Sequence, residues 1–244
     1  MGLLGGGNPG GLLPLGIAAL SLFWLRTPVE SWVGGAPIRV RTPDESQFVR
    51  KTVLFLVVVS VVALTWLFWG GRNGDLLGIG GIAAAAFLLQ AIVRRTWRSA
   101  RTAAQMIGAA GLTSTGPAAY YVVTGRLDRT AWFLWAANLL FAANQIHFVQ
   151  VRIQAAKAKD RREKLAAGGA FFAGQWLLLT LLLAAGAFHV IHWYAAIAFL
   201  PILFRGFAWF AAVPRPLAIH ALGKSELAYA CAFGVLLVAG IGLL

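Results

Sequence analysis

The chain has 244 residues, of which 59% are hydrophobic and only 12% are charged. A soluble globule of this size needs more polar surface than this composition supplies, so the composition predicts an integral membrane protein. The formal charge of +13 would suggest a nucleic-acid partner in a soluble protein, but the basic residues lie between apolar runs and we expect no nucleic acid to bind.

Membrane-spanning helices need about 20 mainly apolar residues. Eight runs approach or reach this length: 11–25, 53–69, 76–93, 102–123, 131–151, 168–188, 190–212 and 227–244. We therefore predict an all-α, polytopic transmembrane helical bundle of eight spans, with residues 1–244 forming a single integral membrane domain. The first run has no basic segment before it, so we expect a helix rather than a cleaved signal peptide.

The basic residues alternate from loop to loop. Eighteen of the 21 Lys and Arg residues, with Arg205, Arg215 and Lys224 assigned to the seventh loop, follow the first, third, fifth or seventh span. Because positive loops stay on the cytoplasmic side, this pattern predicts a multi-pass protein of the cytoplasmic (inner) membrane with both termini outside. We also expect the basic loops to meet anionic lipid headgroups.

Four local features refine the predicted helices. Residues 26–51 contain three prolines and are expected to form a cytoplasmic loop. The run "IQAAKAKDRREKLAAGG" is rich in helix formers and predicts an extension of the fifth span into the cytosol, ended by its two glycines. The run "LTSTGP" around Ser114 predicts a kink or break in the fourth span. Glu226 is expected in the first turn of the last span, where the helix dipole favours an acid.

The fifth span carries an unusual number of polar side chains. One set falls within a helix sector about 140° wide, namely Asn144, His147, Gln150, Gln154, Lys157 and Arg161. A second set lies on the other side, namely Asn138, Gln145 and Arg152. Polar groups in lipid must find partners within the protein or line a wet cavity.

Two interpretations of this pattern stay open. The polar groups are either hydrogen-bonding links between helices or the lining of a cavity open to the cytoplasm that binds a ligand headgroup. In the second case the candidate ligand-binding residues are Asn144, His147, Gln150, Arg152 and Gln154 of the span, with Arg39 and Arg41 of the first loop.

Two stretches carry a resemblance to a known family. "HFVQVRIQAAKAKDRREKL" (147–165) resembles the pattern of YwiC-like proteins, an aromatic residue followed by Val-x-x-x-Ile and a basic helix. "LGKSELAYACAFGVLLV" (222–238) resembles the Ile-Gly-x-x-Glu motif before their last helix. The arrangement is also similar to the intramembrane prenyltransferases of the UbiA superfamily, if their first helix is missing here. This resemblance implies a UbiA-like bundle that binds an isoprenoid or lipid in a cytoplasm-facing cavity.

The chain departs from those families in its acidic residues and its start. A UbiA-type enzyme needs spaced aspartates to hold magnesium ions on a diphosphate, and the chain has no Asp-x-x-x-Asp. Asp44 and Glu45 are adjacent, a pattern more typical of solvated side chains. YwiC-like proteins usually open with His-Gly-Ala-Trp, whereas this chain begins "MGLLGGGNPGG". We expect no metal and no cofactor, with magnesium only if a diphosphate is the substrate, and the sequence leaves the enzyme question open.

Other functions have weaker support. The main alternative is a non-catalytic membrane subunit or assembly partner of a larger membrane complex. A transporter lacks a visible inverted repeat, and a haem would need two histidines at matching depth, such as one pair from His147, His189, His192 and His220. The expected partners are membrane lipids, a quinone or isoprenoid, or other membrane subunits.

Overall fold

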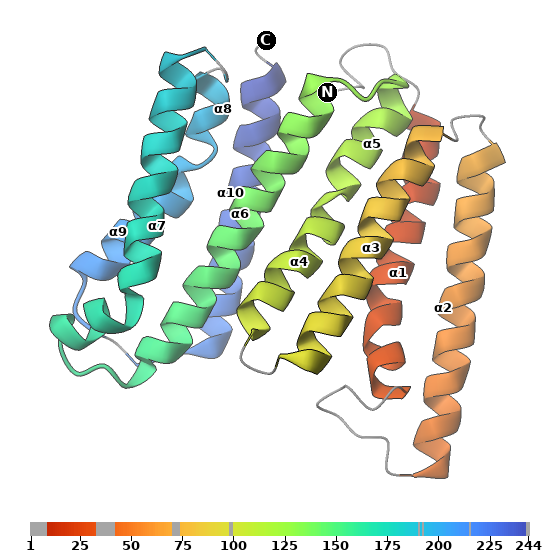
Figure 1. Ribbon diagram of the computed structural model, residues 1–244, viewed down its shortest axis with the longest axis horizontal. Coiled ribbons are helices and arrows are strands. Elements are labelled where there is room, and N and C mark those ends of the chain that lie inside the picture. The colour runs from red at the N-terminus through yellow and green to blue at the C-terminus, as the bar shows by residue number, and fades with distance from the viewer. Residues whose placement is uncertain are drawn as a thin grey trace. The chain divides into compact units, whose positions relative to one another are not determined.

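The computed structural model describes residues 9–32, 42–69, 74–97, 100–189, 191, 193–214 and 216–242. Arg39, Arg41 and His192 lie outside these ranges. Within them the chain is helical and contains no strand (Figure 1). The α-helices are α1 (Leu12–Trp32), α2 (Pro43–Trp69), α3 (Gly74–Thr96), α4 (Arg101–Thr113), α5 (Thr115–Thr124), α6 (Arg129–Gln154), α7 (Arg161–Ala187), α8 (Trp193–Ile197), α9 (Leu200–Ala211) and α10 (Ile219–Gly242). Short 3-10 helices cover Pro9–Gly11 and Ala155–Lys157.

Six stretches of the described chain are long and apolar enough to cross a membrane. They are Pro9–Val29, Pro43–Trp69, Gly74–Thr96, Arg161–Ala187, Trp193–Ala211 and Ile219–Gly240. The predicted all-α polytopic bundle is thereby confirmed. The other two predicted spans, 102–123 and 131–151, correspond to the divided pair α4 and α5 and to the polar helix α6. The number of eight spans stays a prediction.

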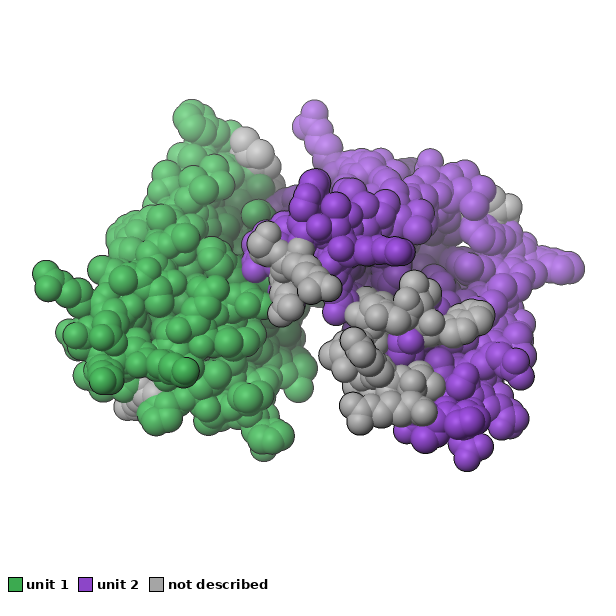
Figure 2. Space-filling model, turned by 60° about the horizontal axis from the view of Figure 1, so that its bottom comes forward, with its two compact units in different colours: residues 1, 140–244 green, residues 2–139 purple. Residues whose placement is uncertain are grey.

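The helices group into two compact units, coloured separately in Figure 2. Unit 1 comprises residues 1 and 140–244, and unit 2 comprises residues 2–139. Each unit is described by itself.

In unit 2, α1 packs along α2 and α3 packs along α4, while α5 contacts both α1 and α3. Side chains from α2, α3 and α5 form a buried hydrophobic cluster, namely Leu67, Leu76, Ile79, Ala118, Tyr121 and Val122. Burial of such side chains against each other stabilises the packing of these helices.

The first predicted loop is shorter than expected. α1 continues through Pro28 to Trp32, and α2 already begins at Pro43. Proline costs little at the first position of a helix, because its missing N–H would have no partner there. Thr42 and Glu45 then cap α2 reciprocally: the Glu45 N–H donates to Thr42 Oγ1 and the Thr42 N–H donates to Glu45 Oε2, each at 3.2 Å.

The predicted break in the fourth span is confirmed at Ser114, between α4 and α5. Pro117 has no N–H and its ring obstructs the carbonyl four residues earlier, so the helix cannot run through unchanged. The Ser114 hydroxyl donates to the carbonyl of Gly111 at 2.7 Å, and the indole N–H of Trp135 donates to the carbonyl of Ala110 at 3.0 Å. Side chains of unit 2 thus satisfy backbone groups next to the break.

In unit 1, α7 packs against α9, and α10 packs against α8 and α9. The buried residues Phe148, Val151, Phe171 and Leu222 form an apolar cluster. A polar cap fixes the start of α7.

The predicted extension of the fifth span is wrong. α6 ends at Gln154, and the chain turns at Ala158 before α7 begins at Arg161. Asp160 starts the new helix, because its Oδ1 accepts from the Glu163 N–H at 2.8 Å. The Glu163 carboxylate accepts in turn from the Lys159 N–H at 2.8 Å.

The two glycines expected to stop that extension lie inside α7. A Cβ on Gly168 would lie 2.8 Å from Phe210 Cζ and 3.0 Å from Val151 Cγ1, whereas one on Gly169 would meet nothing within 4 Å. Gly168 therefore allows close packing of α7 against its neighbours rather than ending a helix.

Candidate functional site

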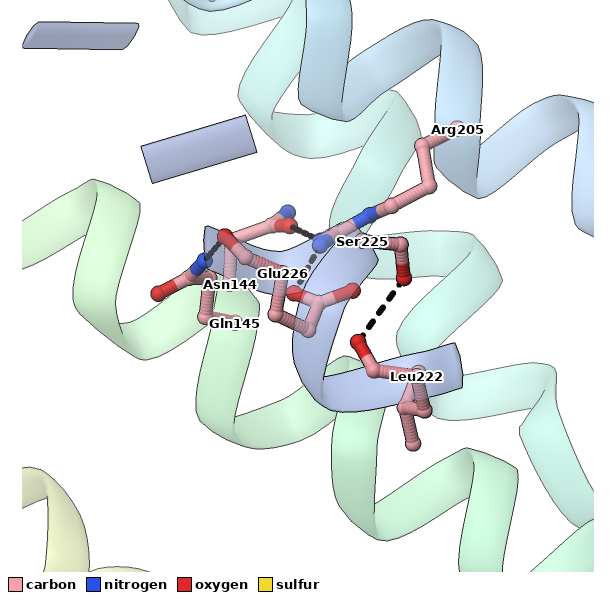
Figure 3. Close-up of polar contacts among 6 residues, drawn as sticks. All are labelled: Asn144, Gln145, Arg205, Leu222, Ser225 and Glu226. Atoms are coloured by element: carbon pink, nitrogen blue, oxygen red, sulfur yellow. Dashed lines mark hydrogen bonds and ion pairs between the residues drawn. The ribbon is translucent and has the colours of Figure 1, made fainter. Parts of the chain in front are cut away.

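A buried ion pair links two helices of unit 1 (Figure 3). Arg205 Nη1 on α9 donates to Glu226 Oε2 on α10, and the two side chains are 5% and 12% exposed. Charged groups inside a membrane bundle are rare and costly, and they mark functional sites more often than soluble ion pairs do. This pair is therefore the first candidate for a site.

Two amides of α6 complete the network. Asn144 Oδ1 accepts from Arg205 Nη2 at 2.8 Å, and Gln145 Nε2 donates to the backbone carbonyl of Glu226 at 2.9 Å. Figure 3 shows these side chains converging from α6, α9 and α10. The network joins three helices that are distant in sequence, so it fixes their register as well as satisfying the charges.

Aromatic rings cover the guanidinium group of Arg205. Its Cζ lies 4.1 Å from the ring centroid of Phe148 and 5.1 Å from that of Tyr229. Phe148 is only 2% exposed and also contacts Trp209 edge to face at 6.0 Å. These rings exclude water from the ion pair and attract its cation through their faces.

A second guanidinium group, that of Arg152, lies over the same ring. Its Cζ is 6.0 Å from the Phe148 centroid, and its side chain is half-buried near the end of α6. Arg152 is attracted electrostatically to Glu226, whose carboxylate already pairs with Arg205. The carboxylate of Glu226 therefore acts electrostatically on both guanidinium groups but forms its ion pair with Arg205.

Lys164 adds a third buried cation. Its side chain is 2% exposed, and Nζ donates to the carbonyls of Trp209 and Ala212, the latter at 2.8 Å. These carbonyls end α9, where the helix dipole concentrates partial negative charge, so the lysine is balanced by the helix end. The same contact places the start of α7 beside the end of α9.

Several buried polar atoms in this region have no hydrogen-bond partner. They are Arg205 Nε, Glu226 Oε1 and both amide atoms of Gln175. Gln175 on α7 is fully buried and lies against Gly206, where a Cβ would be 2.8 Å from its Oε1. Since unpaired buried polar atoms cost free energy, the interior of unit 1 holds unused hydrogen-bonding capacity around residues 205 and 206.

The residues singled out in the sequence are only partly brought together. Asn144 and Arg152 join the network through Arg205 and Phe148. His147 instead packs edge-on against Phe171, with centroids 5.3 Å apart. Gln150 is half-buried and Gln154 is exposed at the end of α6.

Two of the central residues were assigned other roles from the sequence. Arg205 was counted with the seventh loop, but α9 extends to Ala211 and buries it. Glu226 was expected in a first turn, but α10 begins at Ile219 and places it in the helix interior. The signal that could have found both was a lone charge within each apolar run, "LPILFRGFAWF" and "SELAYACAFG".

Metal ligands are not clustered in the part of the chain that the structure describes: it contains no group of three His, Cys, Asp or Glu residues placed to hold an ion. Asp44 and Glu45 lie in the first turn of α2, where Glu45 serves the capping contact with Thr42.

Comparison with known proteins gives one match. The model of the YwiC-like protein family matches residues 1–120, so this part of the chain is similar to that family. Apart from residue 1 the matched range lies within unit 2, whereas the two stretches that suggested the resemblance, 147–165 and 222–238, lie in unit 1. No curated protein matches the chain, and no solved structure does.

Proposed function

We propose that this YwiC-like membrane protein binds the phosphate group of a lipid or isoprenoid at the end of unit 1 where α6 ends. The observation that carries the proposal is the charge balance around Phe148. Arg205 and Arg152 both lie over this ring, and a single carboxylate, that of Glu226, forms its ion pair with Arg205. Lys164 is compensated separately by the end of α9.

Arg152 is the cation that a ligand would complete. Within the described residues no carboxylate forms an ion pair with it, and its side chain is half-buried rather than free in solvent. A partly desolvated guanidinium group binds phosphate oxygens through two N–H donors at once. The excess of positive charge favours a phosphate-bearing amphiphile over a neutral quinone.

The membrane supplies such ligands at this position. The segment after α6 carries Lys157, Lys159, Arg161 and Arg162, which the loop pattern assigns to the cytoplasmic side. A headgroup on Arg152 would lie at the lipid headgroup level, with its apolar chain along the helices. In this proposal the ligand enters a UbiA-like, cytoplasm-facing cavity, and the protein binds the amphiphile without a metal-assisted transfer step.

Native mass spectrometry of the detergent-extracted protein, with lipid analysis of the bound species, tests the proposal. We expect a co-purified phosphate-bearing lipid or isoprenoid on the wild-type protein. Arg152→Gln should lose most of it. Arg129→Gln, at the opposite end of the same helix, is the matched control and should retain it.

The outcomes separate the two main functional hypotheses. Equal lipid retention by both variants would contradict the assignment of Arg152. A stoichiometric protein bound in place of any lipid would favour the alternative, an assembly partner within a larger membrane complex. The identity of the lipid distinguishes a phospholipid from an isoprenoid phosphate.

A further inference from the structure

The two atoms left without partners on the buried ion pair have opposite hydrogen-bonding character. Arg205 Nε is a donor, and Glu226 Oε1 is a carboxylate acceptor. Both belong to side chains that are already joined through Nη1 and Oε2. Neither one satisfies the other, and both are sealed from solvent.

A simple anion could accept a hydrogen bond from Arg205 Nε but could not donate one to Glu226 Oε1. Its oxygens could accept from Arg205 Nε and Arg152, but a second anion beside Glu226 Oε1 would be repelled by the carboxylate. A group that carries an N–H or O–H donor next to its phosphate would satisfy both atoms. Buried hydrogen bonds to charged groups are the strong ones, so this second contact should affect selectivity measurably.

We propose that the site selects phosphate headgroups that also carry a hydrogen-bond donor, with the phosphate on Arg152 and Arg205 and the donor on Glu226 Oε1. This selectivity rests on the proposed function and names the ligand class more closely. Two membrane headgroups share the required chemistry: phosphoethanolamine offers an ammonium N–H and phosphoglycerol offers a hydroxyl. Phosphocholine has the same phosphate and a positive charge but no donor.

Two contacts from α6 hold the ion pair at separate points. Asn144 holds the guanidinium from α6 through Nη2, and Gln145 holds the backbone of Glu226 rather than its carboxylate. The Glu226 side chain is therefore fixed at one oxygen only. A small rotation of this side chain would present Oε1 to a headgroup without breaking the contacts to α6.

The test uses the full-length protein and a graded series of short-chain lipids. Dioctanoyl phosphatidylethanolamine, its N-methyl and N,N-dimethyl forms and phosphatidylcholine keep the phosphate and the positive charge while losing N–H donors one at a time. Titration followed by native mass spectrometry should show similar binding for the first three and about tenfold weaker binding of phosphatidylcholine. Phosphatidylglycerol, measured alongside, should bind at least as tightly as phosphatidylethanolamine, because its headgroup carries a hydroxyl donor and a net negative charge.

Glu226→Gln links the selectivity to the proposed atom. This variant should reduce the ratio between phosphatidylethanolamine and phosphatidylcholine to about one, while Asp75→Asn, an exposed acid of unit 2, should leave the ratio unchanged. If the Glu226 variant does not fold, the lipid series on the wild-type protein still decides the question. Equal binding across the series overturns the selectivity and leaves the phosphate site intact, whereas no binding of any lipid overturns both.

Discussion

Units 1 and 2 satisfy their buried polar groups in different ways. In unit 2, Ser60 and Ser114 donate to carbonyls of their own helical segments, those of Leu56 at 2.7 Å and Gly111 at 2.7 Å. In unit 1, Arg205 and Lys164 bond to groups on other helices. The bonds of Ser60 and Ser114 are local, and the bond from Trp135 on α6 to Ala110 on α4 is uncharged, whereas the bonds of unit 1 make its packing depend on charge. A ligand with charged groups could therefore influence unit 1 far more than unit 2.

The largest effect is expected from breaking the buried ion pair. Arg205→Leu leaves Glu226 buried and unpaired, so it should lower the free energy of unfolding by about 3–5 kcal/mol. Ser60→Ala in unit 2 removes a local bond only and should change it by less than about 0.5 kcal/mol. Unfolding in mixed detergent and SDS micelles, followed by circular dichroism, measures both.

The double variant Arg205→Leu/Glu226→Leu is the control for this comparison. Because it removes both charges together, it should regain much of the lost stability. A single variant as stable as the wild-type protein would mean that the pair is not buried in the membrane.

The next effect concerns the contact of Lys164 with the end of α9. Lys164→Met keeps the apolar stem but removes two hydrogen bonds from a charged donor, and should cost about 1.5–3 kcal/mol. Lys159→Met, on an exposed side chain of the preceding turn, is the matched control and should cost little. The same unfolding measurement applies. Equal stability of the two variants would contradict a stabilising contact between Lys164 and the end of α9.

Alanine substitutions at two adjacent glycines of α7 are expected to change the stability of unit 1 in opposite directions. Gly168→Ala places a Cβ against Phe210 and Val151 and should destabilise unit 1 by about 1–3 kcal/mol. Gly169→Ala meets open space and should stabilise by up to about 1 kcal/mol, because alanine is the better helix former. Thermal unfolding of the two variants in detergent reports the difference, and the same sign for both would contradict the packing of α7.

The smallest effect is a pH dependence in unit 2, at the start of α6. Burial alone would raise the pKa of Asp128, but hydrogen bonds from the Tyr120 hydroxyl and from the N–H groups of Ala131 and Thr130 outweigh it and hold the pKa below its usual value. A lowered pKa means that this carboxylate stabilises the fold above its ordinary pKa of about 4 and loses that contribution as the pH falls through the lower value.

Asp128→Asn should therefore lower stability slightly at neutral pH, where the carboxylate contributes, change it little at acid pH, and so flatten the profile between them. Thermal unfolding between pH 3 and 7 is the measurement. An unchanged acid profile in the variant would show that Asp128 does not contribute to it.

Much of the fold could be predicted from the sequence because apolar length and helix breakers act locally. The break at Ser114 followed from its neighbouring glycine and proline. The end of α6 and the start of α7 could not be predicted in the same way. The residues around Lys157 favour a continuous helix, whereas a single capping residue, Asp160, starts a new one. A cap depends on side-chain geometry, whereas propensity is summed over many residues.

Only the residues that α6 contributes to the candidate site could be identified from the sequence. The amides of α6 stood out because they interrupt an apolar span, and Asn144 does lie in the network. Their partners were missed because the pairing of Arg205 with Glu226 is a tertiary contact across 21 residues of sequence. The loop-charge pattern explained Arg205 by itself, and the helix dipole explained Glu226 by itself.

The most direct test of the central claim is photocrosslinking with a phosphatidylglycerol that carries a diazirine in its headgroup, mapped by peptide mass spectrometry. The phosphate site predicts adducts concentrated on the end of α6 and on the neighbouring parts of α9 and α10, reduced by Arg152→Gln and by excess unlabelled lipid. Adducts spread equally over the helices of unit 2, unaffected by either treatment, would contradict a phosphate-binding site in unit 1.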